Sequence, residues 1–358
     1  MSGGRVPSVE PSINRENAFE VTVVIVSHNS RGHLAQCLPA VLEQGIADLE
    51  VIVVDCASDD DTISWVRGRY PDVHVLEAGD NLGYAGGNNL GIRNAQGRYV
   101  LVLNPDTVPL AGSMSEMLRV VRERPGALVM AKLVQPDGTV NTCGNDMHFT
   151  GIVTCTGLGD DPASYRGVRQ VFLASGAAVV ASRALWTELG GFCESMFMYG
   201  EDADLSLRAR VLGCDVLCAA DAVIEHDYAL RMTPRKFYLL ERGRLLTIAR
   251  IYEGRTLARA SVALGLMECA TWAYAIGGGP RYLGARAQAL WWMAQHVPEW
   301  SMERRWIQNS RRVPDDSLLP GMVGALPFGQ LMGPRAARFL SLSVGWLFDR
   351  LRPSVLPL

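Results

Sequence analysis

Short runs of β-branched and other apolar residues alternate with amphipathic segments along the first hundred residues. The apolar runs cover residues 21–26, 50–55, 73–77 and 99–103. Segments with helical spacing lie between them and end near residues 44, 69 and 95. Unbroken apolar runs of this length are typical of strands that are buried on both faces of a sheet. The alternation therefore predicts a parallel, doubly wound α/β sheet.

The middle of the chain has a mixed pattern. An apolar run over Val171–Ala181 predicts a strand that is interrupted at Ser175 and Gly176. The further elements predicted here are a helix at 183–190, a loop at 197–204 that caps a helix to about 212, and short strands at 215–219 and 222–225. The last of these strands ends at His226.

The pattern changes from about Phe237, where long segments combine apolar residues with arginine. These segments predict amphipathic helices at 245–252, 258–275, 282–296 and 335–351. Six of the eight tryptophans fall in this region, at positions 272, 291, 292, 300, 306 and 346. Tryptophan and arginine on amphipathic helices suit a membrane interface, which is our prediction. The alternative is a helical subdomain that packs its own core.

Charge is distributed unevenly along the chain. The net charge of −3 and the pI near 6.1 exclude a globally basic protein that binds nucleic acid. Residues 1–228 carry 16 Lys and Arg against 29 Asp and Glu, whereas residues 229–358 carry 18 against 8. Together with the change in pattern, this asymmetry predicts a flexible tail at 1–18, a sheet domain at 19–228 and a helical region at 229–358.

The eight cysteines are scattered and none of them has the paired spacing of a zinc site. The first 20 residues are polar and lack the apolar core of a signal peptide. No stretch of about 20 strongly apolar residues is present, which argues against a transmembrane helix. We therefore expect a cytoplasmic protein with reduced thiols.

Polar clusters follow three of the predicted strands: Ser27–Ser30, Asp55–Asp61 and Asn104–Asp106. Ligands of doubly wound sheets bind beyond these carboxyl ends of the strands. The carboxylate of Asp55 can accept a hydrogen bond from a nucleobase or a ribose, or it can cap a helix. The carboxylate of Asp106 can bind a divalent cation at a diphosphate, or it can belong to an ordinary turn.

A segment rich in glycine and asparagine runs from Asn81 to Asn89. It lacks a Walker lysine and the G-x-G-x-x-G spacing, so that a P-loop and a dinucleotide site of the usual kind are disfavoured. Its glycines would let the backbone approach a ligand, and its amides could hold a sugar or a phosphate. The alternative is an ordinary loop with Asn/Gly turn chemistry.

Three acids cluster at the predicted start of a helix: Glu201, Asp202 and Asp204. Acids at this position often serve only to cap the helix. Helical spacing pairs Asp204 with Arg208, which leaves Asp202 to face a cleft. Crowded like charges raise the pKa of one carboxyl group and make it a better base. Further along, the imidazole of His226 could complete a metal site, although a lone histidine is usually structural.

The order of these motifs is more specific than any one of them: strand–SHNS, strand–Asp, NxGYAGGNN, strand–NPD, GEDxDLxxR and a late histidine. In this order the sequence resembles the inverting nucleotide-sugar glycosyltransferases of the GT-A type, family 2, and within them the rhamnosyltransferase-like branch. The resemblance covers roughly residues 20–228. It implies a Rossmann-like mixed sheet flanked by helices, with a nucleotide-binding half fused to an acceptor-binding half, followed by the C-terminal amphipathic helical region.

The resemblance also implies roles for individual residues. The nucleotide and donor sugar would contact Ser27, His28, Asn29, Asp55, Asn81, Gly83, Asn88, Asn104 and Asp106. A divalent cation, Mg²⁺ or Mn²⁺, would be held by Asp106 and His226. The family's Asp-x-Asp motif has Asn104 in its first position here, which removes one negative charge and loosens the cation. Asp202 would be the general base, with Glu201 as the second choice.

The implied reaction is attack by an acceptor hydroxyl on the anomeric carbon, with inversion. The expected donor is dTDP-rhamnose, and the expected acceptor is a glycan or a polyprenyl-diphosphate-linked sugar of bacterial cell-envelope polysaccharide synthesis. The cationic helices would attach the enzyme peripherally to the anionic inner face of the membrane, or would form a homodimer.

Three alternatives remain open. The first is the same fold with a UDP- or GDP-hexose donor: GlcNAc, galactose, galactofuranose or mannose. The second is a non-catalytic sugar-nucleotide- or glycan-binding protein. The third is a dinucleotide oxidoreductase, which the missing glycine fingerprint disfavours.

Overall fold

A computed structural model describes residues 19–228 and 231–326, together with 330, 348, 350, 351 and 355. The expected tail at 1–18 lies outside the described residues. So does the expected helix at 335–351, except for positions 348, 350 and 351.

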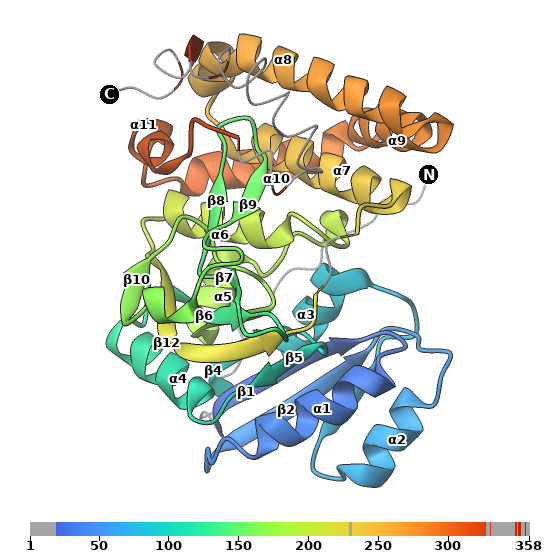
Figure 1. The fold of residues 1–358 in the computed structure, drawn as a ribbon, viewed down its shortest axis with the longest axis vertical. Helices are drawn as coiled ribbons and strands as arrows, with labels where there is room; N and C mark the ends of the chain where they lie inside the picture. Colours follow the sequence, from blue (N-terminus) through green and yellow to red (C-terminus); the bar gives the residue numbers. More distant parts are fainter. Residues whose placement is uncertain are drawn as a thin grey trace.

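A ten-stranded mixed sheet forms the centre of the protein (Figure 1). Its strands run in the order β10-β12-β6-β11-β4-β1-β2-β3, with β5 paired to β12 and β7 paired to β6. The first four strands are parallel, as the sequence predicts: β1 (Phe19–Ser27), β2 (Leu49–Asp55), β3 (His74–Glu77) and β4 (Gly97–Leu103). The sheet becomes mixed because β11 (Ala178–Ser182) lies antiparallel between β4 and β6 (Leu128–Val134).

The remaining strands are short, with one exception. They are β5 (Thr107–Pro109), β7 (Val140–Thr142), β8 (Asn145–Met147), β9 (Val153–Cys155), β10 (Val168–Gln170) and the longer β12 (Val216–His226). The two strands expected at 215–219 and 222–225 are therefore one strand, whose register with β6 shifts between Ala219 and Val223. The expected strand at 171–181 is likewise corrected, because only its second part belongs to β11.

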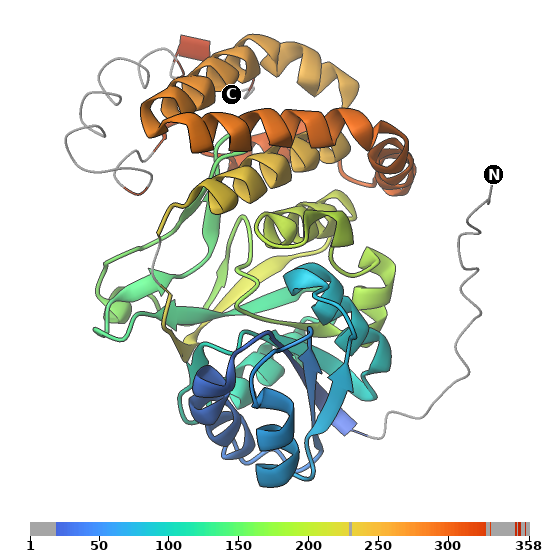
Figure 2. The ribbon, with the colours of Figure 1, turned by 90° about the vertical axis from the view of Figure 1, so that its right-hand side faces the viewer.

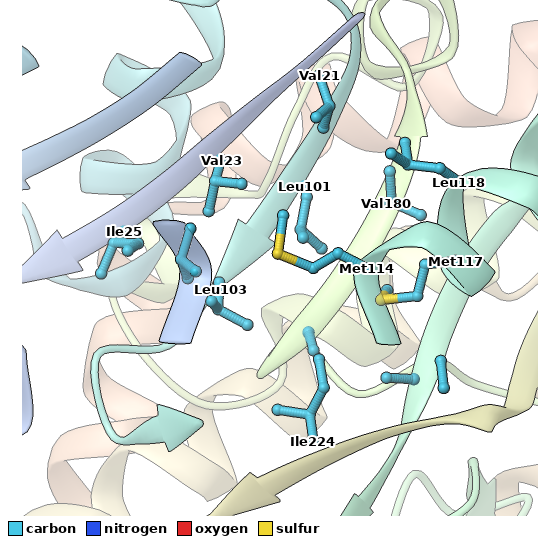
Figure 3. Close-up of a cluster of buried hydrophobic side chains, with 14 of the residues drawn as sticks. Val21, Val23, Ile25, Leu101, Leu103, Met114, Met117, Leu118, Val180 and Ile224 are labelled. Atoms are coloured by element: carbon cyan, nitrogen blue, oxygen red, sulfur yellow. The ribbon is translucent and has the colours of Figure 1, made fainter. Parts of the chain in front are cut away.

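Helices cover both faces of the sheet. They are α1 (Arg31–Leu42), α2 (Thr62–Arg69), α3 (Gly83–Asn94), α4 (Ser113–Glu123), α5 (Arg183–Leu189) and α6 (Glu201–Val211). Successive strand residues point to opposite faces, so Val23 and Ile25 pack with α1 and α4 while Val24 packs under α3, α5 and α6. Figure 3 shows the first of these cores, in which Met114 and Met117 of α4 lie among side chains of β1, β4, β11 and β12.

Five further helices follow the sheet in the described part of the chain: α7 (Pro234–Ile251), α8 (Gly254–Gly278), α9 (Pro280–Gln295), α10 (Val297–Ser310) and α11 (Asp315–Leu318). They form a layer on α6, away from α1 and α2 (Figures 1 and 2). Leu207 of α6, Ile248 of α7 and Met267 of α8 share one core, so the helical layer is packed onto the sheet domain.

One expectation for this layer is corrected, and a second bears on α8. Helix α7 begins at Pro234 rather than near residue 245, because Thr233 caps it by accepting a hydrogen bond from the backbone N–H of Lys236. The sequence also argued against a membrane-spanning helix. Among the described helices, α8 is long and apolar enough to cross a membrane, and 28% of its most apolar stretch is buried in the protein. A helix in the core of a soluble protein can have the same length and composition.

Candidate active site

The loops after β1 and β2 are joined by hydrogen bonds at the carboxyl edge of the sheet. The backbone N–H of Asn29 donates to Oγ of Ser58 over 2.8 Å, and Oδ1 of Asn29 accepts from the N–H of Asp59 over 2.7 Å. Nδ1 of His28 lies 2.8 Å from the carbonyl oxygen of Cys56. His28 and Asn29 are exposed, whereas Ser27 is buried and its Oγ has no hydrogen-bond partner.

Asp55 is only 1% exposed and holds the second of these loops. Its carboxylate accepts from the N–H of Ser58 over 2.9 Å and from the Oγ of Ser58 over 2.5 Å. The helix-cap alternative is wrong, since α2 begins seven positions later and Asp60 accepts from the N–H of Thr62. Asp55 therefore closes its own loop beside Ser27, its partner in the parallel ladder.

The glycine-rich segment is used mainly for packing. A Cβ on Gly83 would meet the ring and the carbonyl oxygen of Phe197, both at 2.5 Å, and one on Gly87 would meet Val26 and Cys56. These glycines let α3 lie close to the sheet and to the 197 loop. Asn81 is exposed and accepts from the N–H of Gly83 over 3.0 Å. Asn88 is fully buried, and its Oδ1 has no partner.

Asp106 and His226 lie together although 120 positions separate them. Thr107 of β5 pairs with His226 at the end of β12. This pairing brings Nε2 of His226 to 3.6 Å from Oδ1 of Asp106, and both atoms are buried without a hydrogen-bond partner. Oδ1 of Asn104 is also buried and unpartnered.

The tautomer of His226 follows from its other nitrogen. Nδ1 lies 3.1 Å from Oδ1 of Asn141, an amide oxygen that can only accept. In the neutral imidazole Nδ1 therefore carries the hydrogen, and Nε2 presents a lone pair toward Asp106. Two electron-rich atoms that face each other this closely suit a cation.

Asp106 and His226 fit a divalent cation that is held by few protein ligands. Among the described residues no group of three or more His, Cys, Asp or Glu side chains could hold a metal. Asp106 and His226 supply two ligand atoms, and Mg²⁺ or Mn²⁺ commonly combines so few with phosphate oxygens of a substrate.

The three acids of α6 have different environments. Asp204 is fully buried and bridges Arg208 and Arg250, at 2.7 and 2.5 Å, so the predicted pair with Arg208 is confirmed. Burial raises the pKa of Glu201 to about 8, and the adjacent Asp202 adds to this shift. Burial also raises the pKa of Asp202, although backbone N–H groups oppose the shift. Asp202 is half-buried and is the more accessible of the pair.

Gly176 and Tyr84 complete the surroundings of Asp202, and the sequence did not single them out as site residues. The N–H of Gly176 donates to Oδ2 of Asp202 over 3.2 Å, and the hydroxyl of Tyr84 donates to the carbonyl of Gly176 over 2.6 Å. Burial raises the pKa of Tyr84 well above its ordinary value, and the charges of Glu201, Asp202 and Asp106 add to this. The interruption at Ser175 and Gly176 was the available sequence signal.

Two main-chain hydrogen bonds connect the strand end beside Asp106 to Asp202. The N–H of Asn104 donates to the carbonyl of Ala177 over 2.9 Å, and the neighbouring Gly176 donates to Asp202. Ser27, Asp55 and Asn104 stand at the carboxyl ends of the adjacent parallel strands β1, β2 and β4. The residues predicted to contact the nucleotide and the cation thus lie at the same edge of the sheet as Asp202.

Several known proteins with similar sequences are named as glycosyltransferases. A hexosyltransferase of low-salt glycan biosynthesis from Haloferax volcanii, Agl10, is 26% identical over 200 residues, which are 53% of this chain and 62% of that protein. The N-acetylglucosaminyl-diphospho-decaprenol L-rhamnosyltransferase of Mycobacterium tuberculosis is 28% identical over 58% of this chain and 76% of its own. The match therefore spans less than two thirds of the Haloferax protein.

Solved structures show the same fold at low sequence identity. GalNAc-T7, crystallised with UDP, GalNAc and Mn²⁺, superposes with a TM-score of 0.57 at 13% identity, over 79% of this chain and 58% of its own. Staphylococcus aureus TarS superposes with a TM-score of 0.52 at 15% identity, over 94% of this chain and 55% of its own. The α/β architecture expected from the sequence, a GT-A mixed sheet flanked by helices, is confirmed.

The family model for glycosyl transferase family 2 matches residues 22–202. This segment runs from β1 to Asp202 and contains the loops after β1, β2 and β4. It makes up just over half of the sequence. The chain belongs to glycosyl transferase family 2.

Proposed function

We propose that this protein is an inverting glycosyltransferase that moves a sugar from a nucleotide-sugar donor to an acceptor hydroxyl in glycan or cell-envelope polysaccharide biosynthesis. The observation that carries the proposal is a pair of main-chain hydrogen bonds, from the N–H of Asn104 to the carbonyl of Ala177 and from the N–H of Gly176 to Asp202. They hold the carboxylate of Asp202, the proposed base, at the same edge of the sheet as the residues assigned to the donor. Ser27, His28, Asn29, Asp55, Asn81, Gly83 and Asn88 are assigned to the donor and its nucleotide.

Asp202 is the proposed general base. Its two oxygens accept from the N–H groups of Gly176 and Ala203, which fix the carboxylate in place. Its raised pKa makes it a stronger proton acceptor than an ordinary aspartate while it is ionised. Asp202 removes the proton of the acceptor hydroxyl as the oxygen attacks the anomeric carbon. Glu201 is buried, so a role beside the acceptor is less favoured for it.

A divalent cation belongs to the same proposal. Asp106 and His226 would hold it, with Asn141 orienting the imidazole. When bound, Mg²⁺ or Mn²⁺ neutralises negative charge on a diphosphate leaving group. Because Asn104 replaces a carboxylate, the protein contributes one negative charge fewer, and the diphosphate contributes more of the binding energy.

Rhamnose from dTDP-rhamnose is the proposed donor sugar, with a polyprenyl-diphosphate-linked acceptor. The relative named as an L-rhamnosyltransferase acting on a diphospho-decaprenol substrate supports this choice. The relative named as a hexosyltransferase supports the main alternative, a UDP- or GDP-hexose donor.

We also propose that residues 229–358 form a peripheral membrane-associating region of a cytoplasmic enzyme. Large apolar side chains are exposed on α8, α9 and α10: Val262, Ile276, Leu290, Trp291, Val297, Met302 and Trp306. Such side chains beside arginines suit an anionic membrane surface. A homodimer through the same helices is the competing use of this surface.

A donor panel tests the proposed function. The purified protein would be incubated with Mn²⁺ and dTDP-rhamnose, UDP-GlcNAc, UDP-galactose, UDP-galactofuranose or GDP-mannose, with and without membrane lipid extract. We expect release of dTDP from dTDP-rhamnose, increased by the extract and abolished in Asp202→Asn. Turnover of another donor would replace the rhamnose assignment. Binding of a sugar nucleotide without turnover of any donor would favour a non-catalytic binding protein.

A further inference from the structure

A pocket of about 740 Å³ lies between α7 and α9, outside the residues assigned to the donor. Three arginines line it, Arg235 and Arg242 from α7 and Arg281 from α9. Phe197, Tyr238 and Gln288 are among the other lining residues, which include no Asp or Glu. The pocket is therefore cationic, with aromatic walls.

Within the described part of the chain, none of these three arginines forms an ion pair with a carboxylate. Most other arginines of the helical layer do, namely Arg244, Arg250, Arg255, Arg259, Arg286, Arg311 and Arg312. The pocket is thus lined by three arginines whose charges have no acidic partner among the described residues.

Arg242 is the most constrained of the three. It is 6% exposed, and its Nη2 donates to the carbonyl of Met196 over 2.6 Å. Its guanidinium lies over the rings of Tyr238 and Trp292, at 5.1 and 4.9 Å from their centroids. Nε of Arg242 is buried and has no partner. A buried donor that lacks a partner is costly unless a ligand satisfies it.

The pocket adjoins the loop that leads into α6 and Asp202. Phe197, which lines the pocket, lies four positions before Glu201 and has a left-handed backbone with φ of +61°. A Cβ on Gly243, next to Arg242, would lie 2.5 Å from the carbonyl oxygen of Tyr199 in that loop. The close approach of α7 at this glycine sets the pocket beside the residues that precede the proposed base.

We propose that this pocket binds the diphosphate of a lipid-linked acceptor, with Arg235 and Arg281 contacting phosphate oxygens and Arg242 supplying its unpartnered Nε–H. Arginine is suited to this chemistry, because its planar fork binds phosphate oxygens in pairs. The aromatic walls suit the first apolar units of the lipid. The inference rests on the proposed glycosyl transfer and extends it by naming where the acceptor's charge is held.

Direct binding of farnesyl diphosphate to the full-length protein tests the inference without catalysis. Isothermal titration would be performed with dTDP and Mn²⁺ at saturation, so that the proposed donor site is filled. Arg235→Gln/Arg281→Gln is the test variant. Arg255→Gln/Arg305→Gln is the matched control, because it removes the same charge from helices α8 and α10 outside the pocket.

We expect the test variant to bind farnesyl diphosphate about tenfold or more weakly than the wild type, since charge-assisted hydrogen bonds are lost. The control should bind as the wild type does, and all three proteins should bind dTDP equally. Farnesol, which lacks the diphosphate, should bind weakly to each. This result would support the inference even if no donor in the panel were turned over.

Three outcomes would overturn the inference. The first is equal binding of farnesyl diphosphate by the test and control variants. The second is equal affinity of the wild type for farnesol and farnesyl diphosphate. The third is a test variant that loses binding to phosphatidylglycerol vesicles but keeps its affinity for farnesyl diphosphate, since the arginines would then recognise the membrane surface and not the acceptor.

Discussion

Arg250 of α7 donates a hydrogen bond from Nη1 to Oδ1 of Asp204 over 2.5 Å, with both side chains buried. The other oxygen of Asp204 accepts from Nε of Arg208, one turn along α6. This contact joins the helix that begins with Glu201 and Asp202 to the C-terminal helices. It also explains why only two acids of the cluster remain available for chemistry.

Removal of Asp204 should therefore destabilise the whole protein. Asp204→Ala leaves the buried Arg208 without its carboxylate and leaves Arg250 with only Glu303, and breaking a buried pair typically costs about 3–5 kcal/mol. Urea denaturation should show this loss. Glu188→Ala is the control, because its pair with Arg312 is exposed and should contribute no more than about 1 kcal/mol. A loss of that small size in Asp204→Ala would contradict the structural role.

Asp202→Asn should remove the base while it preserves the shape of the site. We expect kcat to fall by about 10²–10⁴-fold, the usual contribution of general-base catalysis. Affinity for the donor nucleotide should change by less than about twofold. The exposed Asp72→Asn serves as the control. If Glu201→Gln reduces kcat more than Asp202→Asn does, Glu201 is the base.

Asn141 should affect the cation without touching it. It fixes the tautomer of His226, and loss of such an orienting partner typically weakens metal binding by about 10–100-fold. Titration of Mn²⁺ into the dTDP-saturated protein should show this loss in Asn141→Ala. The control is Asn94→Ala on the exposed side of α3. Unchanged Mn²⁺ affinity in Asn141→Ala would mean that Asn141 does not orient a metal ligand.

Gly176 should tolerate no side chain. A Cβ there would lie 2.7 Å from the hydroxyl of Tyr84 and 3.3 Å from Cβ of Asp202. Gly176→Ala should lower kcat/KM by about 10²-fold, as small displacements of a catalytic group do. Gly126→Ala, which has open space around it, should be neutral. Adding Tyr84→Phe to Gly176→Ala should recover part of the loss, and no recovery would argue against the clash.

Stability should depend on pH through Glu201. Its pKa rises from 4.5 to about 8 in the folded protein. Between these values the unfolded chain ionises while the folded protein keeps the proton, so stability falls as pH rises through this window. Glu201→Gln should therefore stabilise the protein, and the gain in urea denaturation should grow from pH 5 to pH 8. The exposed Glu43→Gln should give no such trend.

The N-terminal half of the fold is predictable from the sequence because its signals are local. β-branched runs at β1, β2 and β4 form strands wherever they are buried on both faces. Parallel strands place their carboxyl ends at one edge, so the grouping of Ser27, Asp55 and Asn104 follows from their positions after strands. The pairing of Asp204 with Arg208 is equally local, since it needs only the helical repeat.

Long-range contacts decided the rest, and no local pattern encodes them. The antiparallel insertion of β11 brings Gly176 to Asp202, and the β5–β12 pairing brings His226 to Asp106. Nothing in the sequence distinguishes the three arginines of the α7–α9 pocket from the others, because their lack of acidic partners within the described residues is a property of the fold. Local patterns place the ends of β1, β2 and β4 and the start of α6. Which of these residues come into contact follows from strand register and helix packing, because both depend on burial summed over the whole chain.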